Sequence, residues 1–421
     1  MDRREFLKIG SIGGLMLSSG KVDAVANQAA NVEKRVTLFA QMTDLHLEGW
    51  NPVEAVSNLE WAIKEINAVS PQPACILVTG DLIMEGRAEE LAVYAKTVKG
   101  ASSSVPLYAL PASHDLPDEE HTQDWERLIG PLRQRVDAGG LSLVLWDEFD
   151  RGNYKDWKAM MSPAKRAWLE QAFRESHGRP VVVAQHAPPL PINRNYHDVW
   201  RDSNADELLD FLRQHKVLSV ITGHWHRNGE WTARGVRIIN TGPLCGFQYN
   251  GVAPYWCFPT RPGYRLFHWD GEQLRSFWRD GSYWKRPAPT VQVALTHIGE
   301  AHTGGPRPQV RQVIIGGPAT LRAAAYASKG QVASVEWSIC EGSWRPMRRV
   351  FDGPWSEWED VLDPNELRVL GSQTAVVRAN TKAPAAYDAV PIELTERDCF
   401  VNQCSAITSR EMVYELFYPV R

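Results

Sequence analysis

Short apolar runs alternate with stretches of helical periodicity along the first two thirds of this chain. Each run is short, rich in aliphatic residues and followed by polar or turn-forming residues, as expected of a buried strand. The five runs that matter most lie at Val36–Thr43, Ala74–Thr79, Val105–Leu110, Val181–Gln185 and Val217–Thr222. Helical spacing of apolar side chains is found at Val53–Ala68, Ser162–Gly178 and Asn204–His215. Strands that alternate with helices predict an α/β fold with a largely parallel sheet.

A change of pattern divides the chain near the Pro-containing stretch Arg286–Thr290. Residues 35–285 carry the alternating pattern, which ends in expected strands such as Val236–Asn240 and Tyr264–Trp269. Residues 286–395 lose helical periodicity and show short alternating runs separated by turns, which predicts a C-terminal all-β sandwich domain. Residues 396–421 contain a last apolar segment that could dock as a strand on either domain.

The N-terminal segment has the pattern of a targeting signal. The pair Arg3-Arg4 precedes the short apolar stretch Ile9–Leu17, and Ala24-Val25-Ala26 offers a small-residue cleavage site. We therefore expect a twin-arginine signal peptide over residues 1–26, a linker over 27–34, and export by the bacterial twin-arginine (Tat) machinery to the periplasm or beyond. An amphipathic surface helix is the alternative. Since no later segment reaches 18 apolar residues, we expect no transmembrane segment in the mature chain.

Composition narrows the classes of partner. The chain has 421 residues and a formal net charge of −4, which is too mild to indicate a nucleic-acid partner. Its 17 Trp residues favour sheet packing over a stacking surface for sugars or bases. Its six Cys form no CxxC metal motif. Cys75 lies in an expected core strand, and the pairs Cys245/Cys257 and Cys399/Cys404 are close enough in sequence to form disulfides, with the pairing left open.

Asp and His residues follow the five apolar runs in a fixed order. The motifs are Asp44-Leu45-His46, Gly80-Asp81, Ser113-His114-Asp115, His186 and Gly223-His224-Trp225-His226. Ligands at the carboxyl ends of strands meet at one rim of an open sheet, and residues two apart on an extended strand end point the same way. Mixed imidazole and carboxylate ligands suit Mn, Fe, Zn or Co better than Ca or Mg. The sequence therefore predicts a site for two divalent ions, which at ~3.5–4 Å apart share a hydroxide and clamp a displacement at phosphorus.

In this order the motifs resemble the calcineurin-like metallophosphoesterase family, whose pattern is D-x-H, G-D, G-N-H-D/E, H and G-H-x-H. The resemblance covers residues 35–285 and implies a sandwich of two sheets flanked by helices. It also implies a first metal held by Asp44, His46 and His226, and a second held by His186 and His224, with Asp81 bridging. His114 would protonate the leaving group or stabilise the transition state, and Asp115 would orient His114.

One residue departs from the family pattern. Ser113 stands where the family has an Asn that binds the second metal. A neutral hydroxyl on a shorter side chain is a poorer ligand, so we expect a weakened second site that still works.

Outside the motifs, three residues are candidates for the walls of the substrate cleft: Trp50, His197 and Trp225. In the C-terminal domain, the segment Ala333–Ser338 and the later Trp355 and Trp358 resemble Ig- or fibronectin-like modules of exported phosphoesterases. Such a module caps the active-site rim, mediates dimerisation or binds an envelope ligand, and the sequence does not choose among these roles.

These observations predict an exported, metal-dependent hydrolase of a small phosphate ester. The segment His186-Ala-Pro-Pro and the expected helix from Asn204 resemble the cyclic-nucleotide and glycerophosphodiester branch, which favours diesters over monoesters. The alternative is a degenerate site, disabled at Ser113, in a protein that binds an envelope glycan or a partner.

Overall fold

A computed structural model describes most of the chain. The described residues are 36–49, 52–116, 121–149, 159–190, 204–249, 257–259, 261–282, 287–299, 301–302, 313–340, 342–381 and 385–395. Within this part of the chain, no helix combines the length and apolar character that a bilayer crossing requires. The expected signal peptide, the linker, Trp50, His197 and residues 396–421 lie outside the described residues.

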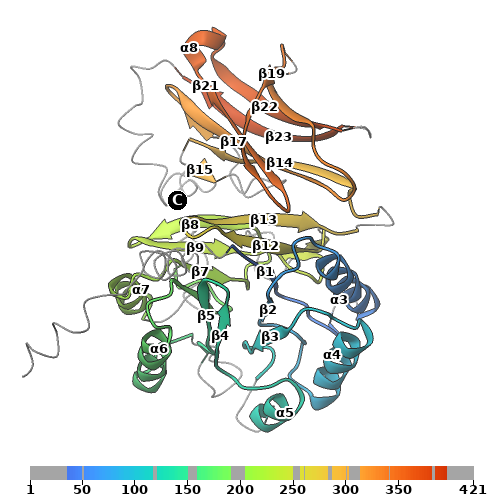
Figure 1. The fold of residues 1–421 in the computed structure, drawn as a ribbon, viewed down its shortest axis with the longest axis vertical. Coiled ribbons are helices and arrows are strands. Elements are labelled where there is room, and N and C mark those ends of the chain that lie inside the picture. Colours follow the sequence, from blue (N-terminus) through green and yellow to red (C-terminus); the bar gives the residue numbers. More distant parts are fainter. Residues whose placement is uncertain are drawn as a thin grey trace, which may run out of the picture.

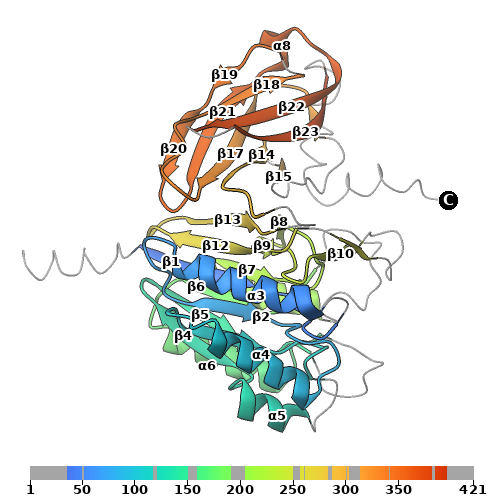
Figure 2. The ribbon, with the colours of Figure 1, turned by 90° about the vertical axis from the view of Figure 1, so that its right-hand side faces the viewer.

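The first sheet has five strands in the order β13-β12-β1-β2-β3. Its strands are β1 (Thr37–Met42), β2 (Ile76–Thr79), β3 (Leu107–Leu110), β12 (Gly263–Trp269) and β13 (Leu274–Asp280). The first three run parallel, and β12 and β13 extend the sheet antiparallel beyond β1. Three helices, α3 (Pro52–Asn67), α4 (Ala88–Gly100) and α5 (His121–Leu128), lie on its outer side (Figures 1 and 2). Their apolar residues share one buried cluster with those of the sheet.

The second sheet has six strands in the order β4-β5-β6-β7-β9-β8. Its strands are β4 (Gln134–Ala138), β5 (Leu141–Leu145), β6 (Val181–Ala184), β7 (Ser219–Thr222), β8 (Gly229–Ala233) and β9 (Val236–Asn240). The helices α6 (Pro163–Glu175) and α7 (Ala205–Gln214) cover its outer side (Figure 1). Between the sheets, Phe39 and Leu77 pack in one cluster with Val182 and Ile221. The predicted α/β sandwich of two sheets flanked by helices is therefore confirmed.

The C-terminal domain is all-β, as predicted. One sheet contains β14 (Val291–Ile298), β15 (Ala301–His302), β17 (Ala319–Ala327), β20 (Arg348–Asp352) and β21 (Ser356–Leu362). The other contains β16 (Val313–Ile315), β18 (Ser334–Ile339), β19 (Arg345–Pro346), β22 (Gly371–Asn380) and β23 (Ala386–Leu394). Pairing is antiparallel except between β16 and β23. Trp337 and Trp358 are buried between the sheets, which supports the packing interpretation of the Trp content. A single-turn helix, α8 (Pro364–Leu367), and a hairpin of β10 (Phe247–Tyr249) and β11 (Cys257–Pro259) complete the described elements.

The C-terminal domain packs against β12 and β13, and Figure 1 shows it standing beside these two strands. Trp355 stacks on Phe277 with ring centroids 5.7 Å apart. At the edge strand β13, the Gln292 amide accepts a hydrogen bond from Asp280 N–H and donates one to the Trp278 carbonyl. Since unpaired edge groups are costly to bury, Gln292 completes this edge as a neighbouring strand would.

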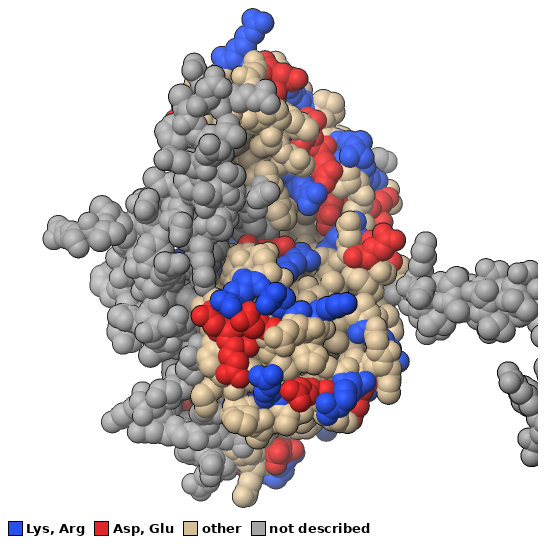
Figure 3. All heavy atoms as spheres, turned by 90° about the vertical axis from the view of Figure 1, so that its left-hand side faces the viewer, with Lys and Arg blue, Asp and Glu red and all other residues tan. Residues whose placement is uncertain are grey.

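Charged side chains of both signs lie next to one another on the described surface of the face in Figure 3. This mixture agrees with the small formal net charge of −4.

We predict that Trp355→Ala weakens the packing of the C-terminal domain against β12 and β13. Trp355 is 2% exposed, and loss of a buried Trp ring costs about 3–5 kcal/mol. The control is Trp344→Ala. Trp344 is half-buried and lies under the Arg378 guanidinium at 4.0 Å, so its loss should cost about 1 kcal/mol. Urea unfolding curves of both variants provide the test, and equal losses would contradict the interdomain role.

A second prediction concerns Asp388 of β23, whose Oδ2 accepts the Leu295 N–H of β14 at 2.9 Å. Burial, with the nearby Asp280 carboxylate, raises the pKa of Asp388 to about 6. Its unfolded pKa is about 3.9, so the folded chain binds this proton more tightly, and stability falls by roughly 3 kcal/mol as pH rises from 4 through 6. Asp388→Asn keeps an acceptor for Leu295 but cannot ionise. In urea unfolding, the variant should exceed the wild type in stability at pH 7 and match it near pH 4; a gap independent of pH would refute the assignment.

Candidate metal centre

The Asp and His residues of the five motifs converge at the carboxyl ends of strands in both sheets. Asp44, Asp81 and His114 follow β1, β2 and β3, while His186 follows β6 and His224 and His226 follow β7. The side chains are buried; even the most accessible residue, His114, is 9% exposed. Three of the resulting groups could each hold a metal ion, namely Asp44/His46/His226, His46/Asp81/His114 and Asp81/His186/His224.

The backbone places these side chains by left-handed turns. We expected Asp44 and His46 on an extended strand end, but β1 ends at Met42, and their φ angles are 52° and 43°. Asp81, His224 and His226 also have positive φ, between 51° and 69°. Residues other than Gly adopt this conformation at a cost of order 1–3 kcal/mol, and such strain gathers at functional sites.

Glycine is required beside these turns. A Cβ on Gly223 would overlap Thr43 Oγ1 and lie 2.6 Å from Asp44 Oδ2. A Cβ on Gly80, whose φ is 82°, would lie 2.7 Å from His186 Nδ1. Both glycines therefore let the backbone approach the ligand side chains.

The first group of donors lies around Asp44. The Nε2 atoms of His46 and His226 are 3.1 Å apart, and His226 Nε2 lies 3.2 Å from Asp44 Oδ1. His226 Nδ1 lies 2.7 Å from the Phe247 carbonyl, which accepts its proton and leaves a lone pair on Nε2. That lone pair faces a carboxylate oxygen, an arrangement that a cation between them stabilises.

The second group repeats this chemistry around Asp81. His186 Nε2 lies 3.0 Å from Asp81 Oδ2 and 3.2 Å from His224 Nδ1. His186 Nδ1 is 2.7 Å from the Thr79 carbonyl, so Nε2 again carries the lone pair in the neutral ring. His46 Nε2 lies 3.6 Å from the same Asp81 oxygen, which places Asp81 between the two groups. The donor set therefore fits two divalent ions with Asp81 between them.

Protonation equilibria favour ligand forms at several positions. Burial, with the neighbouring imidazoles, lowers the pKa values of His46 and His224 well below the usual range, so both rings are neutral. Burial opposes a charge on His186 too, but the Asp81 and Asp44 carboxylates outweigh it and raise the pKa of His186 to about 10. A metal ion at Asp81 supplies the same positive charge as that proton and competes with it for the lone pair.

Ser113, the departure from the family pattern, is 3% exposed. Its Oγ has no hydrogen-bond partner among the described residues. Burying an unpaired hydroxyl costs about 1–3 kcal/mol, so this position is suited to a group that the protein itself does not supply.

His114 and Asp115 differ from expectation in their contacts. We expected Asp115 to orient His114, but it is the Met84 carbonyl, 2.7 Å from His114 Nδ1, that fixes this ring. The Asp115 carboxylate accepts backbone N–H groups from Leu82, Ile83 and Ala112. It therefore joins the loop after β2 to the loop after β3. Burial and the Asp81 charge raise the pKa of Asp115 to about 8.

Trp225 is the one cleft candidate that lies among the described residues. It is 5% exposed and stacks on Trp231 at 5.3 Å, so it is a packing residue and not an open wall of a cleft.

Cys75 is buried, as expected, and burial raises the pKa of its thiol to about 12. Cys245 is buried beside His226, with Sγ 3.9 Å from Nδ1. Cys245 is a free cysteine, so the structure does not form the Cys245/Cys257 disulfide, while Cys399 and Cys404 lie outside the described residues and their disulfide stays a prediction.

Glu148 and Phe149, which follow β5, are two further residues of the site that were not predicted from sequence. Glu148 Oε1 accepts the Ala187 N–H at 2.6 Å, directly after His186. The Phe149 ring lies 6.1 Å from the rings of His186 and His224. A signal was present in the sequence, because Asp147-Glu148 is an acidic pair directly after an apolar run. The backbone carbonyls of Thr79, Met84 and Phe247 gave no such signal, since every residue carries a carbonyl whatever its side chain.

Comparison with known proteins agrees with this geometry. Residues 37–228 match the family model described as calcineurin-like phosphoesterase. A glycerophosphodiester phosphodiesterase, GpdQ of Enterobacter lignolyticus, is 27% identical over 243 residues, which cover 54% of this chain and 83% of that protein. The human serine/threonine-protein phosphatase CPPED1 is 26% identical, over 43% of this chain and 62% of that protein.

A 3',5'-cyclic-nucleotide phosphodiesterase of Nostoc sp. is 23% identical, over 56% of this chain and 88% of that protein. Among solved structures, GAP50 of Plasmodium has a TM-score of 0.44 and 11% identity, covering 61% of this chain and 87% of that chain. The family model covers the strands and turns that carry all five motifs. Through residues 37–228 the chain therefore belongs to the calcineurin-like phosphoesterase family, and it is a metallophosphoesterase, an enzyme that hydrolyses phosphoric esters.

Proposed function

We propose that this enzyme hydrolyses a small phosphodiester at a centre of two divalent metal ions. The observation that carries the proposal is the position of Asp81, whose Oδ2 lies 3.6 Å from His46 Nε2 in one group and 3.0 Å from His186 Nε2 in the other. Two of the similar proteins, from Enterobacter lignolyticus and Nostoc, are named as phosphodiesterases, which supports a diester over a monoester.

The protein's own residues have distinct tasks in this reaction. Asp44, His46 and His226 would hold one ion, His186 and His224 the other, and Asp81 both. The chemistry that such a pair supplies is a shared hydroxide at neutral pH and neutralisation of charge on the phosphoryl oxygens, and Mn, Fe, Zn and Co suit these ligands.

His114 is the proposed proton donor to the leaving group. Its Nδ1 proton is donated to the Met84 carbonyl, so Nε2 is the atom that holds or releases a proton. Its ring lies edge-on to that of His46, with centroids 5.1 Å apart, which places it beside the first group of ligands. Transfer of that proton to the departing alkoxide avoids release of a strongly basic anion.

We further propose that Ser113 leaves the second ion more weakly held, since its short hydroxyl replaces an amide ligand. The buried Oγ, which has no hydrogen-bond partner within the described ranges, is suited to hydrogen-bond a water on that ion.

We also propose that the enzyme works in the periplasm or outside the cell, after Tat export. Arg3-Arg4 and the short apolar stretch after it support this location. Export in the folded state would let the buried ligands bind their metals before translocation. An envelope ligand of the C-terminal domain is part of the same proposal.

The proposed function predicts that chelated protein is inactive and that Mn²⁺ restores turnover of bis-p-nitrophenyl phosphate to a greater extent than that of p-nitrophenyl phosphate. His114→Ala should lower kcat by about 10²–10⁴ and leave metal content unchanged. The control is His177→Ala, an exposed histidine after α6, which should match the wild type. A wild-type protein that binds two ions per chain but hydrolyses neither ester would refute the proposal and favour a binding module with a degenerate site.

Ser113→Asn restores the family ligand, and we predict that it tightens the second metal. Calorimetric titration of chelated protein with Mn²⁺ should show two binding steps in the wild type. In the variant, the affinity of the weaker step should rise at least about tenfold, or about 1.4 kcal/mol. Ser113→Ala is the matched control and should leave the weaker step no tighter than in the wild type. If neither occupancy nor turnover rises in Ser113→Asn, Ser113 is not the weak point of the site.

A further inference from the structure

We propose that Arg265, which lies outside the five motifs, is a positioning residue for the metal centre. Its guanidinium fixes the strand-end segments that carry the ligands through a continuous network of buried hydrogen bonds. The inference rests on the proposed function in one respect only, namely that the ligands it positions are those of a working metal centre.

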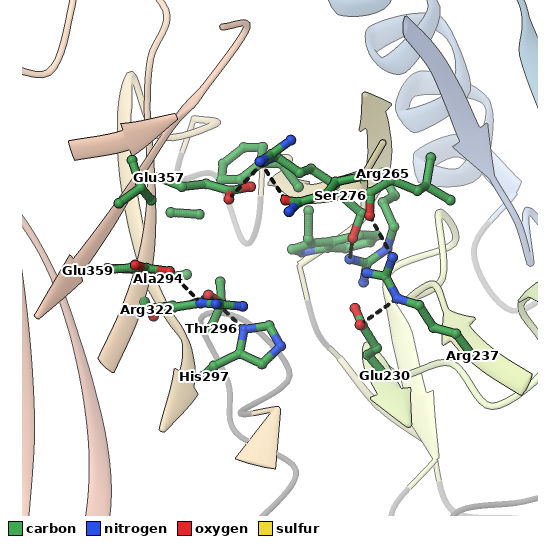
Figure 4. Close-up of a pocket in the computed structure, with 18 of the residues that line it drawn as sticks. Glu230, Arg237, Arg265, Ser276, Ala294, Thr296, His297, Arg322, Glu357 and Glu359 are labelled. Carbon is green, nitrogen blue, oxygen red and sulfur yellow. Dashed lines mark hydrogen bonds and ion pairs between the residues drawn. The ribbon is translucent and has the colours of Figure 1, made fainter. Parts of the chain in front are cut away.

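Arg265 lies on β12 and is 3% exposed. It lines a cavity of about 620 Å³ between the two domains. Figure 4 shows it on one wall with Ser276, Arg237 and Glu230, while Arg322 and His297 lie on the opposite wall.

Its hydrogen bonds are unlike those of the other arginines of the cavity. Arg237 pairs with Glu230 at 2.7 Å, Arg322 with Glu359 at 2.7 Å, and Arg275 with Glu357 at 3.5 Å. In the part of the chain that the structure describes, Arg265 instead donates to four neutral oxygens, which are Thr241 Oγ1, Ser276 Oγ, Asn228 Oδ1 and the Asn240 carbonyl, at 2.6 to 3.4 Å. Burial lowers the pKa of Arg265 to about 10, so the buried charge is costly. The planar guanidinium of Arg265 thus makes four hydrogen bonds to three separate segments. Such bonds fix the positions of the segments relative to one another and do not form an ion pair.

One branch of the network runs from Arg265 into the first sheet. Thr241 Oγ1 accepts from Arg265 Nε and donates to Gln41 Oε1 at 2.6 Å. Gln41 Nε2 in turn donates to Thr79 Oγ1 at 2.8 Å and to the Thr222 carbonyl at 3.1 Å. Each link is buried, and the donors all point the same way, so each bond polarises the next.

This branch ends at metal ligands in both groups. The Thr79 carbonyl lies 2.7 Å from His186 Nδ1, the contact that fixes this ring. The same carbonyl lies 2.9 Å from Thr43 Oγ1, which is also 2.9 Å from Asp44 Oδ2. Gln41 therefore fixes the ends of β1 and β2, from which Asp44 and Asp81 emerge.

The other branch fixes the loop that carries His224 and His226. Arg265 Nη2 donates to Asn228 Oδ1, two residues after His226, and Asn228 also accepts the Gly242 N–H at 3.0 Å. Asn240 donates to the Arg227 carbonyl at 2.7 Å and accepts from Thr222 Oγ1 at 2.7 Å. Arg265 thus stands where both branches meet, and its loss would remove a buried donor from acceptors on three segments.

The test replaces Arg265 with Met, which keeps the length of the side chain and removes all donors. Co²⁺ titration of chelated protein should show affinity weaker by roughly 10–100-fold, as outer-shell changes typically cause. The visible absorption of bound Co²⁺, which reports ligand geometry, should shift as well. Arg265→Lys keeps the charge but not the fork and should recover only part of the loss.

Arg279→Met is the matched control. Arg279 on β13 is 2% exposed and bonds Glu65 and the Pro289 carbonyl, and it lies over the Tyr326 ring. Its partners thus belong to α3 and the interdomain contact, so this variant should lower the melting temperature without changing Co²⁺ affinity or spectrum.

The proposal is overturned if Arg265→Met binds Co²⁺ with wild-type affinity and spectrum, or if Arg279→Met produces the same changes. Should Arg265→Met fail to fold, Thr241→Val removes one link of the network, and wild-type Co²⁺ binding in that variant overturns the proposal equally. Metal titration needs no substrate, so a protein that hydrolyses no ester would refute the proposed function while leaving this test intact.

Discussion

The concentration of metal-ligand atoms around Asp81 is the constraint on which the rest of the structure depends. Imidazole nitrogens of different residues lie 3.1 and 3.2 Å apart, and oxygens of Asp44 and Asp81 lie 3.0 to 3.6 Å from these nitrogens, all of them buried. Lone pairs and carboxylates at these separations repel one another unless a cation lies between them. The facing sheets, the tight turns and the carbonyls that accept the Nδ1 protons all serve to hold these atoms in place against that repulsion.

Holding the ligand atoms this close together requires strained backbone, and the strain lies in the turns after the strands. Three of the five motifs, those at Asp44, Asp81 and His224, leave their strands through residues of positive φ, and Gly80 and Gly223 stand where any side chain would strike a ligand or its neighbour. Strained residues persist only where surrounding contacts over-determine them. Here the Asp115 carboxylate supplies some of these contacts, because it accepts backbone N–H groups from the loops after β2 and β3.

The fold class, and a set of Asp and His residues that the structure brings together, could be predicted from sequence because each depends on local patterns: apolar runs with helical stretches between them, and Asp or His after each run. Prediction failed where the decisive contact joins residues far apart in the sequence, or where a backbone carbonyl makes it, since every residue carries one. Asp115 was predicted to orient His114, but the Met84 carbonyl lies 2.7 Å from His114 Nδ1, and the Asp115 carboxylate accepts backbone N–H groups. The contacts of Arg265 were invisible because its network joins residues as far apart as Gln41 and Thr241, separated by 200 positions. No periodicity or spacing encodes such a pair.

The C-terminal domain acquires a structural role from the same network. Strand β13 is a sheet edge, and edge strands fluctuate and pair wrongly unless they are covered. Gln292 bonds the backbone of β13, and Trp355 packs on Phe277, so the domain completes and buries that edge. Ser276 of β13 accepts from Arg265, and the register of β12 sets where the guanidinium lies. The all-β domain thus covers the strand whose Ser276 bonds Arg265, and through that strand it would contribute to the proposed positioning of the metal centre.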